Sequence, residues 1–374
     1  MQFSVFTETL VNAVQIVSKA AASKTSIPAL TGIYIEAHDN NNLLLKATDL
    51  ELGIECIIKA DIEEKGVMVI PAKYFMELLR KLPPTMLTFF TQEDHNQLNI
   101  KFYESQISLN TFPPEQFSFL PDLKNSNSIT IDHQLLSNMI KKIIFSISND
   151  LSRPVLNGAL LEINNDKIRM VSSDFYRLSM VELNMEKLGG TSFKPVIIPG
   201  KALIEVARFT FKDDLVTIGI DDNQVQFEGD NFNLRVRLIS GVFPSYANVI
   251  PEEYLTRIVV DTRELLLCVE RAAVVASDVN YNKNCIVNLE IKEETLLMKA
   301  YSPNIGQVND KIFIEKEGED LNISFNSNYL IEALKVIDTE KTIIEFGGHL
   351  SPGIIKPYEA HMDFLTLILP VRQG

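Results

Sequence analysis

One pattern of residues recurs three times along this chain of 374 residues, and it limits the possible folds more than any other feature. Two apolar strand candidates joined by a turn run from Ile27 to Cys56 and again from Ser152 to Leu183. A fainter third copy runs from Lys283 to Ile312. Self-similarity at a fixed spacing is the signature of tandem structural units, so each copy is expected to form the same kind of unit.

A second phrase follows each copy and keeps the same offset. It places a glutamate at Glu77, Glu205 and Glu332, which are 128 and 127 residues apart. Two independent phrases with one offset predict three tandem domains of about 125 residues, an ordinary size for a domain. The expected domains are residues 1–125, 126–252 and 253–374.

Within each third, the patterns predict helices combined with antiparallel strands. The expected order is a helix, two strands, a short strand, a second helix and then three or four strands. Thr7, Asp132 and Asp261 precede or begin apolar helical runs, where such side chains cap helices. This arrangement is typical of an α+β fold with helices segregated from antiparallel sheets. The six helices are expected at residues 8–19, 72–82, 132–146, 200–212, 261–276 and 327–338.

Composition argues against several classes of protein. The first residues lack a basic region followed by a long apolar core, so no signal peptide is expected. No apolar run reaches the roughly 18 residues of a membrane span, so no membrane partner is expected. Cys56, Cys268 and Cys285 lack metal or redox spacing and predict a reduced, cytoplasmic chain. The five histidines are scattered singly, as expected of surface residues rather than metal ligands.

The sequence carries no catalytic signature. Motifs for phosphate loops, dinucleotide binding, zinc proteases and nucleophile elbows are missing from it. Asp49 and Asp174 hold equivalent positions in two repeats and could suggest paired catalytic carboxylates. The third repeat has Ser302 there, so a role in the turn at the end of a strand is the better interpretation. We therefore expect no catalytic residue, no cofactor and no metal, and a protein that is not an enzyme.

Charge is distributed unevenly along the chain. The net charge of −14 would by itself argue against a nucleic-acid partner. The six helix segments nevertheless carry twelve basic and nine acidic residues, a net charge of +3, which leaves −17 elsewhere. This contrast indicates a helical face that meets a polyanion while the other faces repel it. The alternative is that helices simply tolerate lysine and arginine better than strands do.

Three similar units with two helices each suit a ring whose inner face is lined by helices. At the usual separation of about 8–10 Å between helix axes, a circle wide enough for hydrated duplex DNA holds about twelve helices. Twelve helices correspond to six repeats, and therefore to two copies of this chain. The repeat thus predicts a ring-shaped, head-to-tail homodimer around DNA.

Several collinear segments carry a resemblance to a known family. They are SKTSIPALTGI from Ser23, ATDLELGI from Ala47, RPVLNG from Arg153, SSDFYRLS from Ser172, GVFPSY from Gly241 and LPVR from Leu369. Over essentially its whole length the chain resembles the bacterial DNA polymerase III β subunit, the β sliding clamp. The resemblance implies a processivity factor for DNA replication that encircles duplex DNA, tethers the polymerase and catalyses nothing.

The resemblance also implies partners and a location. The expected partners are double-stranded DNA bound without sequence preference, the DNA polymerase III catalytic subunit, the clamp loader, and other polymerases and repair proteins with clamp-binding peptides. Phosphate contacts hold DNA without reading its sequence, so such a ring could slide. The expected location is the bacterial cytoplasm, with association with the nucleoid during replication.

Individual residues can be matched to the family's DNA-facing surface. By resemblance, these are Lys24, Lys73, Arg153, Lys201 and Asn326. Helix position and charge add Arg80 and Arg208 to this set. Each of the seven could instead be an ordinary solvated surface residue.

The resemblance further implies a peptide pocket between the second and third repeats. Such a pocket would take an extended peptide with one or two apolar anchors. Its residues would be Leu156, Ser173, Phe175, Tyr176, Arg177, Leu178, Pro244, Val249, Leu367 and Leu369, with Val371 and Arg372 beside them. Phe175-Tyr176 stands where Gly-His is more common, and Leu369-Pro-Val replaces Met-Pro-Met, so the peptide preference is expected to differ. Taken alone, the apolar run before Leu369 would be an ordinary buried strand.

The ring joint would pair the first repeat of one chain with the third repeat of another. Leu78 and Ile107 are expected to face Val274 and Val275, beside a strand pairing that continues the outer sheet. The two valines could instead belong to the core of their own repeat.

Two other functional classes remain compatible with a repeat protein. A repeat-built interaction scaffold that does not encircle DNA would have helices no more positive than the rest of the chain. A ligand-binding protein or an enzyme with a cleft between repeats would need convergent polar or catalytic residues, and the sequence offers none.

Overall fold

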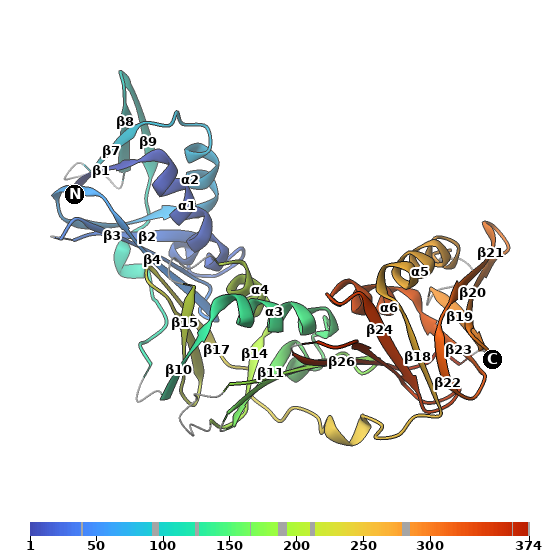
Figure 1. The fold of residues 1–374 in the computed structure, drawn as a ribbon. Coiled ribbons are helices and arrows are strands. Elements are labelled where there is room, and N and C mark those ends of the chain that lie inside the picture. Colours follow the sequence, from blue (N-terminus) through green and yellow to red (C-terminus); the bar gives the residue numbers. More distant parts are fainter. Residues whose placement is uncertain are drawn as a thin grey trace. The chain divides into compact units, whose positions relative to one another are not determined.

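The structure, a computed structural model, describes residues 1–38, 40–91, 97–123, 127–164, 166–185, 193–209, 214–278, 285–360 and 362–372. The chain divides into two compact units. Unit 1 comprises Met1–Leu136 with Arg208–Leu238, and unit 2 comprises Ser137–Ala207 with Ile239–Gly374. The second repeat is therefore divided, and it contributes four strands to one sheet of each unit (Figure 1).

Among the described residues, six α-helices lie where the apolar spacing predicts them. They are α1 (Thr7–Val17), α2 (Ala72–Leu79), α3 (His133–Ile143), α4 (Gly200–Arg208), α5 (Thr262–Ala276) and α6 (Ser327–Lys335). Short 3₁₀ turns at Ser18–Ala20 and Ile144–Ser146 extend α1 and α3 to the predicted ends. Residues 210–212 of the predicted fourth helix lie outside the described residues.

Two of the three expected helix caps are confirmed. The Oδ1 atoms of Asp132 and Asp261 accept hydrogen bonds from the backbone N–H groups three residues further on, at 2.9 and 2.7 Å. The prediction for Thr7 is wrong. Helix α1 begins at Thr7 itself, and the Thr7 hydroxyl donates to the backbone carbonyls of Pro83 and Thr85, both at 2.8 Å. This threonine joins the start of α1 to the loop that follows α2.

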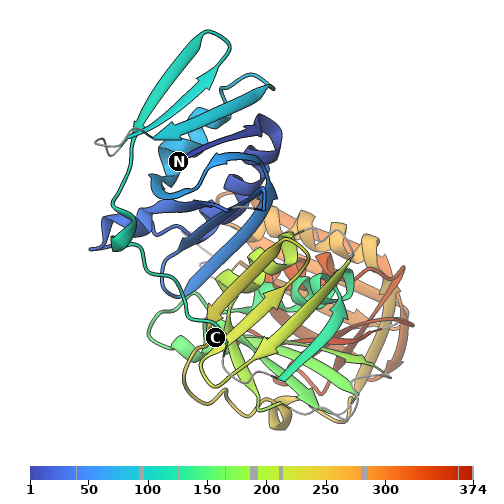
Figure 2. The same cartoon turned by 90° about the vertical axis from the view of Figure 1, so that its left-hand side faces the viewer.

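Unit 1 holds two sheets. The five-stranded sheet has the order β5 (Asp61–Glu64), β1 (Gln2–Phe6), β7 (Met86–Thr91), β8 (Gln97–Phe102), β9 (Ser105–Asn110). The eight-stranded sheet has the order β10 (Asn127–Asp132), β15 (Leu215–Ile220), β16 (Gln224–Glu228), β17 (Phe232–Arg237), β4 (Leu52–Lys59), β3 (Asn42–Thr48), β2 (Gly32–Ala37), β6 (Gly66–Pro71). Helices α1 and α2 pack together, with α1 against β3 and β4, and Figure 2 shows the β8–β9 hairpin extending from this unit.

Unit 2 repeats this plan with a nine-stranded and a four-stranded sheet. The larger sheet has the order β14 (Val196–Pro199), β11 (Gly158–Asn164), β12 (Lys167–Ser173), β13 (Arg177–Asn184), β26 (Asp363–Ile368), β25 (Gly353–Pro357), β24 (Lys341–Phe346), β18 (Thr256–Asp261), β22 (Glu315–Gly318). The smaller has the order β21 (Gly306–Phe313), β20 (Thr295–Ser302), β19 (Ile286–Lys292), β23 (Leu321–Asn326). Helices α5 and α6 pack against each other, and α5 also packs on β20 and β21.

Neighbouring repeats are joined strand to strand by equivalent edges. The last strand of the second repeat, β17, pairs antiparallel with β4 of the first repeat. In the same way β26 of the third repeat pairs antiparallel with β13 of the second. The corresponding last strand of the first repeat is β9, and the strand of the third repeat that corresponds to β4 and β13 is β21. Both of these strands are sheet edges within this chain.

The expected order of elements needs one correction. A strand precedes the first helix of every repeat, namely β1, β10 and β18, and four or five strands rather than three lie between the two helices. The strands β1, β10 and β18 are hard to recognise from the sequence, because no glycine or proline separates each strand from the helix that follows it. The strand ending at Asp132 continues directly into α3, and the one ending at Asp261 continues directly into α5.

The turn interpretation of the repeated aspartates is confirmed. Asp49 and Asp174 each accept hydrogen bonds through Oδ1 from the backbone N–H groups two and three residues further on, at 2.8–3.1 Å. Ser302 does the same through Oγ, with both distances at 3.1 Å. The three side chains thus close equivalent turns between strands. Because their oxygens are committed to backbone groups, a structural role is sufficient to explain them.

Candidate DNA and partner-binding surfaces

Four of the proposed DNA-facing residues lie in unit 1, and all four are exposed. Lys24 lies in the loop before β2, Lys73 in the first turn of α2, Arg80 directly after α2, and Arg208 at the end of α4. The Lys73 Nζ atom lies 6.0 Å from the centre of the Tyr74 ring. These four long basic side chains thus reach solvent rather than a core.

The other three lie in unit 2. Arg153 and Lys201 are exposed, the former just before β11 and the latter in the first turn of α4. Asn326 is half-buried and has a local structural role. Its Oδ1 accepts a hydrogen bond from the backbone N–H of Asn328 at 2.9 Å and thereby caps α6. This cap explains an asparagine at the position without any DNA contact.

Three apolar residues of the predicted pocket belong to a buried cluster on one face of the nine-stranded sheet. Leu156, Leu178 and Leu367 are 1%, 4% and 3% exposed and belong to one cluster. Its other buried members are Leu160, Val171, Ile197 and Phe243. Leu178 and Leu367 are direct partners across the β13–β26 pair, which joins the second repeat to the third. These three residues of the predicted pocket thus lie in the core of this junction.

Other residues of the predicted pocket are more exposed than this cluster. Val249 and Leu369 are 51% and 41% exposed, and Pro244 is also exposed, so these apolar side chains reach solvent. The Leu369 N–H donates to the Tyr176 carbonyl at 2.8 Å. Two residues later, the Val371 N–H donates to the Ser324 carbonyl at the same distance. These bonds hold the C-terminal segment beside β13 and β23. Ser173 and Val371 are half-buried, and Arg372 is exposed.

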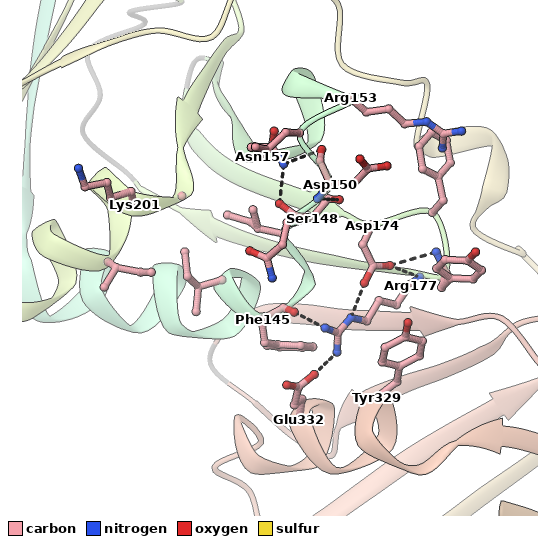
Figure 3. A pocket seen from close by; sticks show the side chains of 18 residues that line it. Phe145, Ser148, Asp150, Arg153, Asn157, Asp174, Arg177, Lys201, Tyr329 and Glu332 are labelled. Atoms are coloured by element: carbon pink, nitrogen blue, oxygen red, sulfur yellow. Dashed lines mark hydrogen bonds and ion pairs between the residues drawn. The ribbon is translucent and has the colours of Figure 1, made fainter. Parts of the chain in front are cut away.

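Arg177 and Leu178 are neighbours on β13, so their side chains leave the sheet on opposite faces. Leu178 belongs to the buried cluster, whereas Arg177 lines a groove of about 930 Å³ on the helical side. Figure 3 shows this groove, with Lys201 at one end and Arg153 at the other. Phe175 and Tyr176 also line it. The predicted pocket residues are therefore divided between two neighbouring surfaces.

Arg177 is buried and ties the second repeat to the third. Its Nε donates to Asp174 at 3.0 Å, and its other nitrogens bond Glu332 of α6 and the Phe145 carbonyl (Figure 3). The guanidinium carbon lies 4.4 Å from the centre of the Tyr329 ring and 5.3 Å from that of Phe145. A buried guanidinium is tolerated only when its donors are satisfied in this way. Arg177 is thus a structural tie within the groove wall.

Phe175 adopts a backbone conformation that favours glycine. Its φ is 73°, and Leu50, the equivalent residue of the first repeat, has the same value. In the turns closed by Asp49 and Asp174 the residue directly after the aspartate is therefore left-handed, whereas the equivalent turn of the third repeat has Pro303 there. Glycine adopts a left-handed conformation without steric cost. Here a phenylalanine that is 50% exposed occupies the position instead.

The sequence did not point to several residues that build these surfaces. Phe145, Tyr329 and Glu332 line the groove, and Phe243 and Tyr246 contact the buried cluster. The first three are far from Arg177 in sequence, so no local pattern links them. Phe243 and Tyr246 belong to the GVFPSY segment, which carries the family resemblance but no signal of a structural role.

The cysteines and histidines show where thiols and imidazoles lie in this fold. The three cysteines are free, and burial raises the pKa of Cys56 and Cys268 to about 12. In the part of the chain that the structure describes, no group of three or more His, Cys, Asp or Glu side chains could hold a metal ion. One histidine expectation is wrong, because His133 at the start of α3 is buried. His95 and His361 lie outside the described residues.

Comparison with known families identifies the family of the chain that carries these surfaces. Residues 1–121, 130–245 and 247–372 match the N-terminal, central and C-terminal domains of the DNA polymerase III beta subunit. The chain belongs to the DNA polymerase III beta subunit family. It is built of three tandem clamp domains. Members of this family are sliding clamps, which encircle DNA and tether replication partners to it, and this is the role of the chain.

Named relatives and solved structures agree over the full length. The chain is 31% identical to the beta sliding clamp of Bacillus subtilis (strain 168) and 33% identical to that of Halalkalibacterium halodurans, covering 100% of both chains in each pair. A crystal structure of the Bacillus subtilis sliding clamp superposes with a TM-score of 0.94 at 31% identity, with 100% of both chains covered. A Pseudomonas aeruginosa sliding clamp bound to griselimycin gives a TM-score of 0.93 at 25% identity and the same coverage.

The proposed interface residues of this sliding clamp divide into exposed and buried positions. Leu78 on α2 and Ile107 on β9 are half-buried, and Val274 on α5 is 65% exposed. Val275 is only 7% exposed in the single chain, so it belongs to the core beneath α5, which was the alternative interpretation of the two valines. The helical period explains the difference, because successive residues of a helix point about 100° apart.

Within the described residues, no helix is long and apolar enough to cross a membrane.

Proposed function

We propose that two copies of this chain form a closed head-to-tail ring that slides on duplex DNA and has no catalytic activity of its own. The observation that carries this proposal is the repeated edge pairing of the sheets. β17 pairs with β4, and β26 pairs with β13, by equivalent strands of successive repeats. The remaining equivalent edges are β9 and β21. Pairing β9 of one chain with β21 of another would be the third use of the same joint, and two such joints close a ring.

Side chains next to these edges fit an apolar joint. Ile107 lies on β9 itself, and Leu78 lies on α2 of the same repeat. In the third repeat α5 packs on β21, and it presents Val274 to solvent. We assign Leu78, Ile107 and Val274 to the interface and leave Val275 to the core. The joint would then have an apolar centre flanked by main-chain hydrogen bonds of the extended sheet.

The DNA contacts would come from basic side chains on or beside the helices. Lys24, Lys73, Arg80, Arg153, Lys201 and Arg208 are all exposed. Long, solvated side chains attract phosphates from any register, and contacts to phosphate carry no sequence information. The acidic remainder of the chain would repel DNA from the outer faces. We keep Asn326 in the set only as a residue near DNA, because its side-chain oxygen caps α6.

The test of the DNA-facing set is the salt dependence of direct binding. A variant with Lys24, Arg153 and Lys201 changed to alanine should bind duplex DNA with a log–log salt slope that is smaller by about one for each lost phosphate contact. The matched control changes Lys59, Lys101 and Lys292, which are exposed basic residues of strands, and should keep the original slope. An unchanged slope in the first variant, or an equal change in the control, would contradict the assignment.

We further propose that partner proteins bind at the junction of the second and third repeats. The buried cluster of Leu156, Leu178 and Leu367 provides an apolar floor, and Val249 and Leu369 provide exposed apolar walls. An extended peptide with one or two apolar anchors fits such a surface. The expected partners are the DNA polymerase III catalytic subunit, the clamp loader, and other polymerases and repair proteins with clamp-binding peptides.

The junction of the first and second repeats supports this assignment by contrast. The position equivalent to Leu178 is Gly53, which follows the Asp49 turn by the same spacing. A Cβ atom at Gly53 would lie 2.8 Å from Phe119, so the ring of Phe119 already covers this site. The Nζ atom of Lys46 lies 5.2 Å from the centre of the Phe119 ring, and the Cζ atom of Arg235 lies 5.5 Å from it. Phe119 thus packs directly against Gly53 at the first junction, whereas the second junction has the side chain of Leu178 there and the exposed Val249 and Leu369 as candidate walls.

Three further expectations, on domain boundaries, role and location, complete the proposal. The domain boundaries are proposed at residues 1–125, 126–252 and 253–374. The ring is proposed to act as a subunit of the replicative polymerase rather than as an enzyme. Its proposed location is the bacterial cytoplasm, on the nucleoid during replication.

A further inference from the structure

The segment from Gly241 to Ile250 crosses the nine-stranded sheet on the face that carries the buried cluster. The opposite face meets the helices, because the Ser172 hydroxyl donates to the Ile143 carbonyl at the end of α3, whereas its neighbour Val171 belongs to the cluster. The segment supplies Pro244 and Val249 to the proposed partner site. It is largely irregular, with a single 3₁₀ turn at Ala247–Val249. Its position on the sheet must therefore be fixed by side chains.

Two features fix the first half of the segment. Phe243 is 8% exposed and packs into the cluster beside Leu160 and Leu178. Gly241 has a φ of 136°, and a Cβ atom there would lie 2.6 Å from Cγ1 of Val155. The chain can thus turn tightly onto the sheet only with glycine at this position. These contacts anchor the segment before Pro244, so Val249 needs a second anchor nearer to it.

The second anchor is a polar ladder that continues the same sheet face beyond the apolar cluster. Glu162 of β11 is the cross-strand partner of Arg169 of β12, and Arg169 is the partner of Glu182 of β13. Arg169 donates to Glu182 through Nε at 2.9 Å and through Nη2 at 2.5 Å. Glu182 also accepts a hydrogen bond from Lys167 at 2.6 Å. Three neighbouring strands are thereby connected by charged hydrogen bonds, which are stronger and better oriented than neutral ones.

Tyr246 connects the segment to this ladder. Its hydroxyl donates to Oε2 of Glu162 at 2.5 Å and accepts from Nη1 of Arg169 at 2.9 Å. Burial raises the pKa of Tyr246, and the hydrogen bond to Glu162 raises it further, so the hydroxyl stays protonated and donates. The Tyr246 carbonyl in turn accepts from the Val249 N–H at 3.2 Å. Tyr246 thus bonds the sheet through its hydroxyl and Val249 through its backbone carbonyl.

We infer that Tyr246 is a positioning residue of the partner-binding site, whose hydroxyl sets where Val249 and Pro244 stand relative to the Leu369 wall. The inference rests on the proposed partner site and deepens it. Tyr246 need not touch a bound peptide. Its hydroxyl keeps the segment from shifting along the sheet, so the two walls stay at a fixed separation. A peptide that binds between them therefore does not have to order the walls first, and less binding free energy is lost.

A double-mutant cycle tests this role. The probe is a labelled peptide that copies the C-terminal residues of the DNA polymerase III catalytic subunit, titrated into the full-length chain. Tyr246→Phe keeps the ring that packs on the cluster and removes only the hydroxyl. It should weaken peptide binding about five-fold, the order expected from the net contribution of one typical hydrogen bond. Glu162→Ala should weaken it by a similar factor, and the double variant should be no weaker than either single variant.

Two further variants separate positioning from a general loss of structure. Glu162→Gln keeps an oxygen that can accept from Tyr246, and it should restore binding to within about two-fold of the unaltered chain. Tyr34→Phe is the matched control in unit 1, where the Tyr34 hydroxyl donates to Glu36 at 3.2 Å on another sheet. It removes a similar hydroxyl and should leave peptide binding unchanged. The melting temperature should be similar for Tyr246→Phe and Tyr34→Phe.

The possible failures are distinguishable. If the unaltered chain does not bind the peptide, the proposed partner site and this inference both fall. If the unaltered chain binds and Tyr246→Phe binds equally well, only the inference falls. Additive losses in the double variant, or no rescue by Glu162→Gln, would likewise overturn the role of the hydroxyl while leaving the site itself in place.

Discussion

The guanidinium of Arg153 stacks on the ring of Phe175, with Cζ 4.1 Å from the ring centre. Family resemblance matches Arg153 to the DNA-facing surface and Phe175 to the partner pocket, yet the two side chains form one contact at the end of the groove. A cation over an aromatic face is stabilised by about 0.5–1 kcal/mol at an exposed site. Because this is small, Arg153 can leave the ring to meet a phosphate at little cost, and its assignment to DNA is compatible with the contact.

The backbone at Phe175 gives the first prediction. At ordinary positions alanine is more stabilising than glycine, but a left-handed residue reverses the order because Cβ approaches the following carbonyl. Phe175→Gly should therefore be more stable than Phe175→Ala by about 1 kcal/mol in urea unfolding. Leu50, with the same φ of 73°, should show the same order. Alanine ranking above glycine at both positions would contradict the conformation described here.

The ring joint gives the second prediction. Val274→Asp places a charge on an exposed position of α5 and should yield a folded monomer, because the dimer would have to bury that charge unpaired. Val275→Asp places the charge in the core of the third repeat and should destabilise the fold itself by several kcal/mol. Sedimentation and thermal melting separate the two effects. A Val274→Asp chain that remains dimeric at micromolar concentration would remove Val274 from the interface.

Much of the fold follows from the sequence because the repeat fixes equivalent positions. Comparison of the repeats predicts the turns at Asp49, Asp174 and Ser302, and apolar spacing predicts the six helices. Val275 was assigned to the wrong environment, because a helix of mostly apolar residues does not show from sequence which neighbour points inward. The first strand of each repeat was missed because no turn residue separates it from its helix.

The partner site was predicted only in part, for a different physical reason. Its apolar residues were identified through the family resemblance, but whether each is floor or wall depends on what covers it. Leu178 is buried because Phe243 packs over the same face from a distant segment. Val249 is exposed, and it lies on a segment that Tyr246 bonds to the distant residues Glu162 and Arg169. Contacts between segments distant in sequence decide both cases, and no local pattern reports them.

The polar ladder gives a prediction about pH. Burial acts to raise the pKa of Glu182, but hydrogen bonds from Lys167 and Arg169 outweigh it and leave the pKa below its usual value of 4.5. A lowered pKa in the folded chain means that Glu182 stabilises the fold above pH 4.5 and loses this effect as the pH falls through the lower, folded value. Glu182→Gln should therefore melt at a lower temperature than the unaltered chain at pH 7, and the difference should shrink below pH 4.5. A difference that grows on acidification would contradict this.

Removal of the C-terminal segment tests the wall of the partner site. Deleting residues 369–374 takes away Leu369 and the backbone bonds to Tyr176 and Ser324, while the sheets and the proposed ring joint remain. The intact chain should bind the polymerase peptide with micromolar affinity, about −8 kcal/mol, because the buried area is small and the peptide must become ordered. The truncated chain should show no binding by calorimetry and should still sediment as a dimer. Full-strength binding after truncation would place the site elsewhere.

The most direct test of the central claim is retention on circular DNA. The chain would be loaded onto a nicked circular duplex with its clamp loader and then moved into high salt. A closed ring is held by topology, so it should stay on the circle at a salt concentration that releases an ordinary electrostatic binder, and it should leave when a restriction enzyme makes the circle linear. Loss from the intact circle in high salt, or retention on the linear form, would contradict a sliding ring.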